Sequence, residues 1–133
     1  MRNILFFILF LMITWALAQP ADARPKNRLD ATTKTCRVLE SGPLEWASRP
    51  WGEGGKAFKE VCQGCHFKGN DRGATFLWVE SKTSAAWNRV FEQKYPKCAK
   101  DGSWEVLDPE QKMRVNDYLF RWGKNSQSLG DNC

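Results

Sequence analysis

The residues of this sequence whose types and spacing could do chemistry are Cys62, Cys65 and His66, in the run Cys-Gln-Gly-Cys-His. Two cysteines separated by two residues, with a histidine directly after the second, form the pattern for covalent haem attachment. The two thiols would add to the two porphyrin vinyl groups as thioethers, and the histidine would bind the iron from below. Zinc would need further Cys or His ligands at suitable spacing, but His66 is the only histidine. A thioredoxin-like motif would need a βαβ context, which the sequence lacks.

Cysteine counting gives a second expectation. The chain has five cysteines, and two thioethers would leave Cys36, Cys98 and Cys133. In an oxidising compartment two of these should pair. Since Cys36 and Cys133 flank the central part of the chain, we expect a disulfide between them and a free Cys98. The alternative is that Cys98 is in a disulfide and another cysteine is left over to bridge to a partner.

A helix is predicted directly before the Cys62–His66 motif and would position it. Residues 55–62 read as a helix that runs into the motif, with Gly54-Gly55 at its start. Its apolar residues share one helical face: Ala57, Phe58, Val61 and Cys62.

A second helix is predicted near the end of the chain. Asp108 is a good N-cap, Pro109 suits the first helical position, and Gln111 completes a capping box. An apolar stripe with helical spacing follows, and Gly123 sits where a glycine ends helices: Val115, Tyr118, Leu119 and Trp122 form the stripe.

Between these two helices we expect one more. Residues 83–94 show an apolar face of Trp87, Val90 and Phe91, with Ser81, Thr83 or Ser84 as cap candidates. Tyr95-Pro96 should end it, because the residue before proline avoids helical backbone angles. Residues 96–107 are then expected to be a loop. Trp78, Trp87 and Trp104 are interpreted as walls of a haem pocket or core.

Together, Gly54-Gly55-Lys56, Phe58, the Cys62–His66 motif and Tyr118-Leu119 resemble class I cytochromes c over residues 54–123. The resemblance implies an all-α cytochrome c fold wrapped around one covalent haem c, with the first helix crossing the last. Cys62 and Cys65 would then carry the thioethers, and His66 would be the proximal iron ligand.

The resemblance also raises the question of the sixth iron ligand. Class I cytochromes c usually place a methionine in the loop before the last helix. Here Met113 lies inside that helix, nearly opposite its apolar stripe, and Cys98 occupies the loop position. We therefore expect Cys98 as a thiolate ligand, with Met113 or an open site as alternatives. A thiolate stabilises ferric iron and lowers the reduction potential, whereas methionine does the reverse.

The expected function is electron transfer by a monohaem cytochrome, as a carrier rather than an enzyme. A first alternative is NO or CO binding or sensing through a displaceable Cys98 thiolate. A second is the haem subunit of a sulfur-oxidising enzyme, because some His/Cys-ligated cytochromes oxidise thiosulfate. The sequence is also similar to the heterodimeric low-potential cytochromes of anaerobic ammonium oxidisers, which implies a second small cytochrome as a partner.

The remaining segments are organised around that domain. Residues 1–18 resemble a cleaved signal peptide, with an apolar run from Ile4 to Leu17 and an Ala16-Leu17-Ala18 cleavage site; the alternative cut follows Ala23. An exported, periplasmic protein without a stable membrane span is therefore expected. Residues 24–53 are predicted to be an irregular extension in which Trp46 and Trp51 pack locally, and 124–133 a surface tail.

Composition is compatible with this interpretation. A length of 133 residues suits one domain, and the formal net charge of +5 is mild. No dense basic run or nucleic-acid-binding motif is present, so nucleic acid is not an expected partner.

Overall fold

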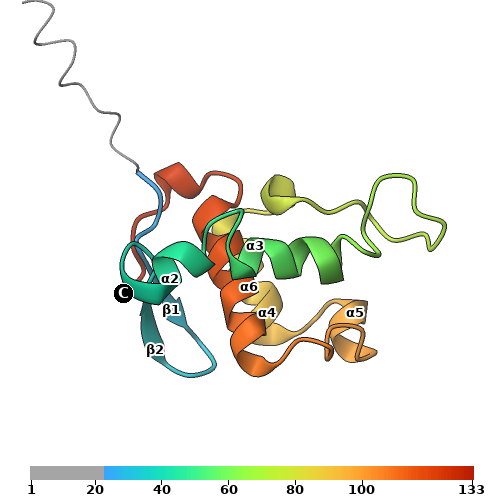
Figure 1. Ribbon diagram of the computed structural model, residues 1–133, viewed down its shortest axis with the longest axis horizontal. Coiled ribbons are helices and arrows are strands. Elements are labelled where there is room, and N and C mark those ends of the chain that lie inside the picture. The colour runs from blue at the N-terminus through green and yellow to red at the C-terminus, as the bar shows by residue number, and fades with distance from the viewer. Residues whose placement is uncertain (1–22) are drawn as a thin grey trace, which may run out of the picture.

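The computed structural model describes residues 23–133, so the predicted signal peptide lies outside the described residues. The described chain is mostly helical and carries one small antiparallel hairpin (Figure 1). Its elements in order are β1 (Asn27–Asp30), β2 (Thr35–Val38), α2 (Gly42–Ala47), α3 (Glu53–Ala57), a π-helical turn (Phe58–Cys62), a 3₁₀ turn (Val79–Ser81), α4 (Ser84–Gln93), α5 (Lys97–Lys100), α6 (Pro109–Trp122) and a second 3₁₀ turn (Ser126–Ser128). The all-α expectation is thus right for the helical part and wrong for the hairpin.

Helix α6 is the central element, and α3 and α4 pack against it (Figure 1). Its start follows the predicted capping box: Asp108 Oδ1 accepts from the Gln111 backbone N–H at 2.8 Å, and Gln111 Oε1 accepts from the Asp108 N–H at 2.9 Å. The predicted stripe faces the core, since Val115, Tyr118 and Leu119 are buried. Because these residues contact α3 and α4 at once, α6 fixes the positions of both.

The crossing of α3 and α6 depends on Gly54. A Cβ atom at this position would overlap the Arg114 carbonyl oxygen and lie 3.0 Å from the Tyr118 Cβ atom. Glycine therefore lets the two backbones approach closely. The helix begins at Glu53, two residues before the predicted start, and Phe58 at its end is 2% exposed in the core.

Helix α4 begins as predicted, with Thr83 Oγ1 accepting from the Ala86 backbone N–H at 3.2 Å. It ends at Gln93, where Lys94 takes a left-handed conformation with φ of 49°. The loop predicted for residues 96–107 contains the short helix α5. Gly123 ends α6 as predicted, but its φ of −61° is one that any residue can adopt. Glycine is needed there for lack of space, because an added Cβ would lie 2.7 Å from the Leu119 carbonyl oxygen.

The prediction of an irregular extension at residues 24–53 is wrong in part, because this segment forms the hairpin and α2. Arg28 of β1 is fully buried, and its Nε donates to Asp117 Oδ1 of α6 at 2.8 Å. Arg37 of β2 reaches the other oxygen of Asp117, with Nη2 2.7 Å from Oδ2. The hairpin is therefore fastened to α6 through buried ion pairs rather than through apolar packing.

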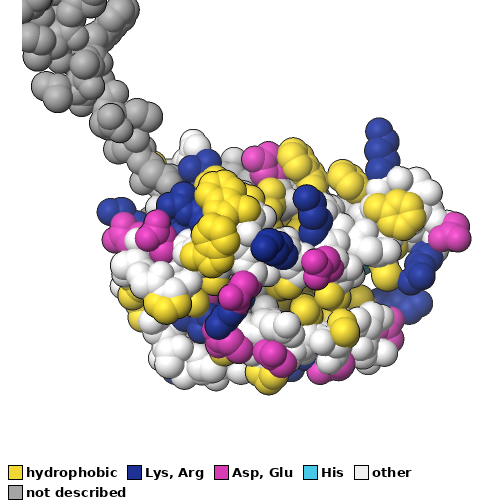
Figure 2. Space-filling model, viewed as in Figure 1, with side chains coloured by type: hydrophobic (Ala, Val, Ile, Leu, Met, Phe, Trp, Pro, Cys, Tyr) yellow, Lys and Arg dark blue, Asp and Glu magenta, His cyan; other side chains and the backbone are white. Residues whose placement is uncertain are grey.

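Trp46 and Trp51 are 55% and 54% exposed, and the Arg49 guanidinium lies over the Trp51 ring, 5.9 Å from its centroid, so their local packing is only partial. Figure 2 shows hydrophobic side chains at the surface where α2 leads into α3. Among residues 23–133, no helix has the length and apolar character needed to cross a bilayer.

The C-terminal segment is tied to the hairpin. The structure joins Cys36 and Cys133 in a disulfide, the pairing that cysteine counting favoured. Next to it, Asp131 Oδ1 accepts from the backbone N–H groups of Lys26 at 2.7 Å and Asn27 at 3.0 Å. The tail thus covers the outer edge of β1.

Candidate haem-binding site

The motif begins where α3 changes its helical period. The Gln63 backbone N–H donates to the Phe58 carbonyl at 3.0 Å, which closes a π-helical turn over Phe58–Cys62. Such single π turns occur often at functional sites, because the extra residue redirects the side chains that follow. Beyond it, the N–H groups of Cys65 and His66 donate to the Cys62 carbonyl at 3.2 and 2.9 Å. The three motif side chains are therefore carried on one compact turn.

The imidazole of His66 is held by a backbone acceptor. Its Nδ1 lies 2.6 Å from the Thr75 carbonyl oxygen. Because a carbonyl only accepts, Nδ1 must carry the proton, and the Nε2 lone pair is left available for a metal. Metal-binding histidines are commonly oriented in this way, with the second nitrogen donating to a carbonyl or carboxylate.

The segment that supplies this carbonyl is itself fastened to the motif. The Leu77 N–H donates to the His66 carbonyl at 3.0 Å, and the Gln63 side-chain amide donates to the Leu77 carbonyl at 2.9 Å. Asn70 organises the turn between them by accepting from the N–H groups of Arg72 at 3.1 Å and Ala74 at 2.9 Å. Thr75 is thus positioned by a network that begins and ends at the motif.

Cys65 and Cys62 differ in their surroundings. Arg72 Nη1 lies 3.1 Å from Cys65 Sγ on the more exposed side of the turn. Cys62 instead packs against the core. The pKa of the Cys62 thiol is raised to about 12, mainly by burial and to a smaller extent by the charges of Cys98 and Cys65. Cys62 and Ala99, the residue after Cys98, both pack against the core cluster.

Cys98 is partly buried and, like Cys62 and Cys65, is not in a disulfide. Its neighbour Ala99 packs against the core cluster. The donor set near the motif is therefore one imidazole and one thiol from separate segments, together with the two motif thiols. No group of three or more His, Cys, Asp or Glu side chains arranged for a bare metal ion exists among residues 23–133. A porphyrin iron needs only axial ligands from the protein, so this donor set fits it.

Aromatic side chains line the end of the core that the motif borders. The Phe91 and Trp104 rings stack at 5.2 Å, and the Trp104 Nε1 atom is buried without a hydrogen-bond partner in the described part of the chain. Trp87 is in the core as expected, but Trp78 is 47% exposed rather than a wall. Other large hydrophobic side chains of the flanking segments are also exposed: Phe67, Phe76, Tyr95 and Val106. Of these, Phe67 directly follows the motif and Phe76 directly follows the Thr75 acceptor, so apolar side chains are exposed next to His66.

The remaining candidate ligands lie elsewhere. Met113 faces the hairpin, where its sulfur accepts from Arg37 Nη1 at 3.6 Å. Cys36 and Cys133 are bonded to each other beside the hairpin. Of the expected sixth ligands, Met113 is thus engaged by the hairpin, whereas Cys98 stays out of any disulfide, and its neighbour Ala99 packs against the same core cluster as Cys62.

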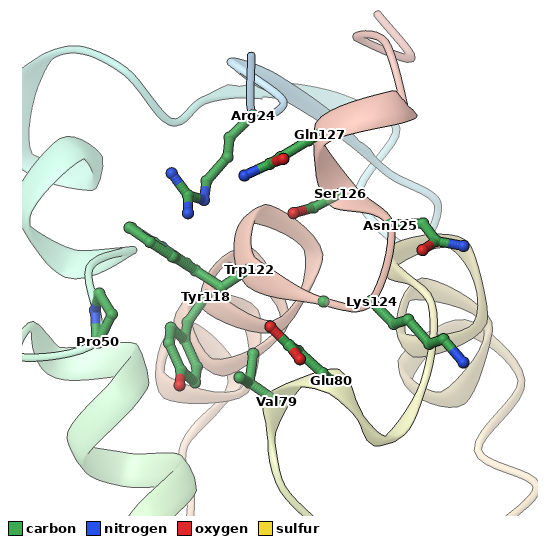
Figure 3. Close-up of a pocket in the computed structure, with 11 residues that line it drawn as sticks. Arg24, Pro50, Val79, Glu80, Tyr118, Trp122, Lys124, Asn125, Ser126 and Gln127 are labelled. Carbon is green, nitrogen blue, oxygen red and sulfur yellow. The ribbon is translucent and has the colours of Figure 1, made fainter. Parts of the chain in front are cut away.

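A separate open cavity of about 460 Å³ lies beside the end of α6 (Figure 3). The Arg24 guanidinium stacks over the Trp122 ring, with its Cζ atom 3.9 Å from the ring centroid, and Tyr118 and Pro50 also line the cavity. No residue of the Cys62–His66 motif lines it.

Comparisons with protein-family models, curated proteins and solved structures found no match to this chain.

Sequence reasoning missed Thr75, Gln63 and Arg72. Thr75 contributes only its backbone carbonyl, so its residue type carries no signal. Asn70 with two nearby glycines was the one available sign of an ordered turn, because both Gly69 and Gly73 have positive φ.

Proposed function

We propose that this protein is a monohaem c-type cytochrome that transfers electrons. The observation that carries the proposal is the hydrogen bond between His66 Nδ1 and the Thr75 carbonyl, within a Cys-x-x-Cys-His motif. It leaves Nε2 as the coordinating atom and holds the ring in one orientation. The exposed rings of Phe67 and Phe76 beside the motif and the orphaned Trp104 donor support a large, partly apolar, acceptor-bearing group in this part of the protein.

Cys62 and Cys65 would hold the haem through thioethers, and His66 would be its proximal ligand. When bound, the haem supplies an iron that alternates between the ferric and ferrous states. We assign Cys98 as the distal ligand because its thiol is not in a disulfide and its neighbour Ala99 packs against the same core cluster as Cys62, while Met113 is engaged by Arg37. As an anionic donor, the Cys98 thiolate favours ferric iron and gives a low reduction potential.

The test uses the full chain produced in a host that exports it and attaches haem. Pigment that stays with the polypeptide in acidified acetone, together with a thioether-type pyridine haemochrome spectrum, is the expected result. Colourless protein, or pigment lost to the solvent, would reject a c-type cytochrome.

The distal ligand is tested by low-temperature electron paramagnetic resonance of the ferric protein. Thiolate-type low-spin signals are expected in the wild type and in Met113→Leu, which is the matched control at the alternative sulfur. They should disappear in Cys98→Ala. Signals that survive in Cys98→Ala and vanish in Met113→Leu would reassign the ligand.

We further propose export to the periplasm and a protein redox partner. The predicted signal sequence at residues 1–18 supports export. Intact-mass measurement of the secreted protein tests it, since removal of residues 1–18 or 1–23 predicts two distinct masses. Full-length mass in a membrane fraction would contradict export as a soluble protein.

One observation favours NO or CO binding as a second function. Helix α5 contains four residues and none of them is buried. Moving Cys98 away from iron would therefore cost little packing energy, and reduction weakens the hold of a thiolate on the metal. Titration of the ferrous protein with CO or NO should then shift the Soret band. An unchanged band would reject gas binding and leave electron transfer as the only proposed function.

A further inference from the structure

Asn70 lies in the middle of the segment that joins the motif to Thr75. Its side-chain amide makes four hydrogen bonds, all of them to the backbone of this segment. The Oδ1 atom accepts from the N–H groups of Arg72 at 3.1 Å and Ala74 at 2.9 Å. The Nδ2 group donates to the carbonyls of Phe67 at 2.9 Å and Ala74 at 2.6 Å. The amide thus uses its acceptor and its donors on backbone groups.

The two bonds to Ala74 fix the chain directly before the acceptor of His66. Asn70 bonds to both polar groups of the Ala74 backbone, the N–H and the carbonyl. Thr75 is the next residue, and its carbonyl oxygen lies 2.6 Å from His66 Nδ1. Beyond it, the Leu77 N–H donates to the His66 carbonyl at 3.0 Å. Thr75 is therefore held between two anchored positions, one of which is the Asn70 amide.

The backbone of this segment has little other support. In the described part of the chain, the one backbone–backbone bond inside residues 67–75 is the long one from the Asn70 N–H to the Phe67 carbonyl, at 3.4 Å. Gly69 and Gly73 have positive φ, are exposed, and contribute no side chain that could pack. The position of Thr75 therefore depends on the Asn70 side chain.

We propose that Asn70 is a positioning residue for the hydrogen bond between His66 and Thr75, and that through this bond it sets how strongly His66 donates to the haem iron. The second half of the inference rests on the proposed function, and the first half does not. An acceptor on the second ring nitrogen fixes the ring and makes the coordinating nitrogen more basic. A more basic imidazole favours ferric iron and lowers the reduction potential. Without the Asn70 amide, the ring should be less constrained and the potential higher.

The first test observes the imidazole directly. His66 is the only histidine, so isotopic labelling of histidine nitrogen gives the signals of a single ring. The full chain is isolated before haem attachment and studied by NMR at about pH 8, where an ordinary imidazole is neutral. The wild type should carry its proton on Nδ1, because the Thr75 carbonyl can only accept. Asn70→Ala should shift the proton toward Nε2, and an unchanged tautomer would overturn the proposal.

The second test measures the midpoint potential of the haem-loaded protein. In Asn70→Ala the ferrous-to-ferric ratio at a fixed potential should rise roughly tenfold, which corresponds to ~59 mV for a one-electron couple. Asn70→Ser should give a smaller rise, because a hydroxyl can accept from an N–H of the turn but cannot replace both bonds to Ala74. A midpoint that stays in place in haem-loaded Asn70→Ala would reject the link to iron.

Asn132→Ala is the matched control. Its Oδ1 also accepts from a backbone N–H, that of Leu29 at 2.7 Å, but this bond fastens the C-terminal tail to β1. The variant should leave the His66 tautomer and the midpoint unchanged. If it moves them as much as Asn70→Ala does, the effect is a general loosening of the fold and the inference is wrong.

Two further outcomes are distinguishable. If Asn70→Ala does not fold, Asn70→Ser decides, and a tautomer and midpoint identical to those of the wild type would overturn the proposal. If no haem becomes covalently attached, the proposed function and the link to iron fail together, while the tautomer still tests the role of Asn70. Covalent haem with an unchanged tautomer and midpoint in Asn70→Ala would reject the inference and leave the proposed function standing.

Discussion

Gly54 shows how one position can set the geometry of the site. With no side chain, it allows α3 to touch the α6 backbone at Arg114 and Tyr118. Helix α3 then directs Phe58 into the core and carries the π-helical turn that ends at Cys62. The position of Cys62 relative to the core therefore depends on the contact that Gly54 makes with α6, eight residues earlier in the chain.

Replacing Gly54 by alanine should lower the free energy of unfolding by about 3 kcal/mol, because the new methyl group overlaps a backbone carbonyl that cannot rotate away. Guanidinium denaturation followed by circular dichroism measures this. Gly130→Ala is the control, since an added Cβ at Gly130 meets no atom within 4 Å. Equal stability of the two variants would show that the helices can separate without cost.

Asp30 gives the hairpin a dependence on pH. Burial alone would raise the pKa of this carboxyl, but hydrogen bonding from the Thr33 backbone and the charge of Arg28 outweigh it and lower the pKa below 3.8. The unfolded chain therefore takes up the proton first as pH falls. The stabilisation is present above pH 3.8 and is lost as pH drops through the lowered pKa of the folded state.

We accordingly expect Asp30→Asn to flatten the decrease in unfolding free energy between about pH 5 and pH 2 relative to wild type. Urea titrations at several pH values measure the slope. The variant will also be less stable at pH 7, because Arg28 loses a partner, so the comparison rests on the slope rather than on the absolute stability. Parallel curves would contradict the assignment.

At the scale of elements, the sequence predicts the helices better than the hairpin, for a physical reason. Capping at Thr83 and Asp108 is local, so spacing alone reveals where α4 and α6 begin. In β1 the inward residues are Arg28 and Asp30, while Leu29 is 37% exposed. This reverses the usual alternation of a strand, and the burial of Arg28 depends on Asp117, 89 residues away. No local pattern could have shown it.

The same division holds for the candidate site. Cys62, Cys65 and His66 are adjacent in the sequence and were identified from their spacing. The acceptor for His66 depends on how the connection after the motif folds back, and it has no local signature.

Asp117 of α6 forms the ion pairs with Arg28 and Arg37 that connect the hairpin to this helix. Asp117→Asn would leave the buried guanidinium of Arg28 without its main counter-charge, and should cost about 3–5 kcal/mol. Thermal unfolding of Asp117→Asn measures this against Glu45→Gln, which breaks the half-exposed pair of Glu45 with Arg49. The control should change stability by about 1 kcal/mol or less. A similar small loss in both variants would mean that the hairpin is held mainly by other contacts.

At the scale of the whole molecule, the chain has two regions with different support. On one side, buried ion pairs join the hairpin to α6, a disulfide joins it to the tail, and Ser48 at the end of α2 accepts a hydrogen bond from Arg121 of α6. On the other, the segment after the motif and α5 is held by backbone bonds and a few core contacts. The proposed haem would lie in the second region and would add apolar contacts there.

The disulfide links positions 97 residues apart, so its loss should matter for the whole chain. By loop-closure entropy, replacing both cysteines in Cys36→Ser/Cys133→Ser should reduce the unfolding free energy by about 4–5 kcal/mol. Chemical denaturation measures this, with reduced wild type as the second comparison. The haem spectrum of the folded variant should be unchanged, since neither cysteine lies at the motif. An altered ligand-field spectrum would show instead that the disulfide supports the iron ligands.

The wide separation of Cys36 and Cys133 also constrains biogenesis. As the chain emerges from its N-terminus, Cys36 meets Cys62, Cys65 and Cys98 before its native partner has been made. Each earlier encounter offers a wrong crosslink, and any crosslink to Cys62 or Cys65 would also consume a thiol that porphyrin attachment requires. If the proposed haem is attached, correct maturation needs either thiol reshuffling or early attachment of the motif thiols to the porphyrin. The yield of native protein should then depend on whether haem attachment or disulfide formation is completed first.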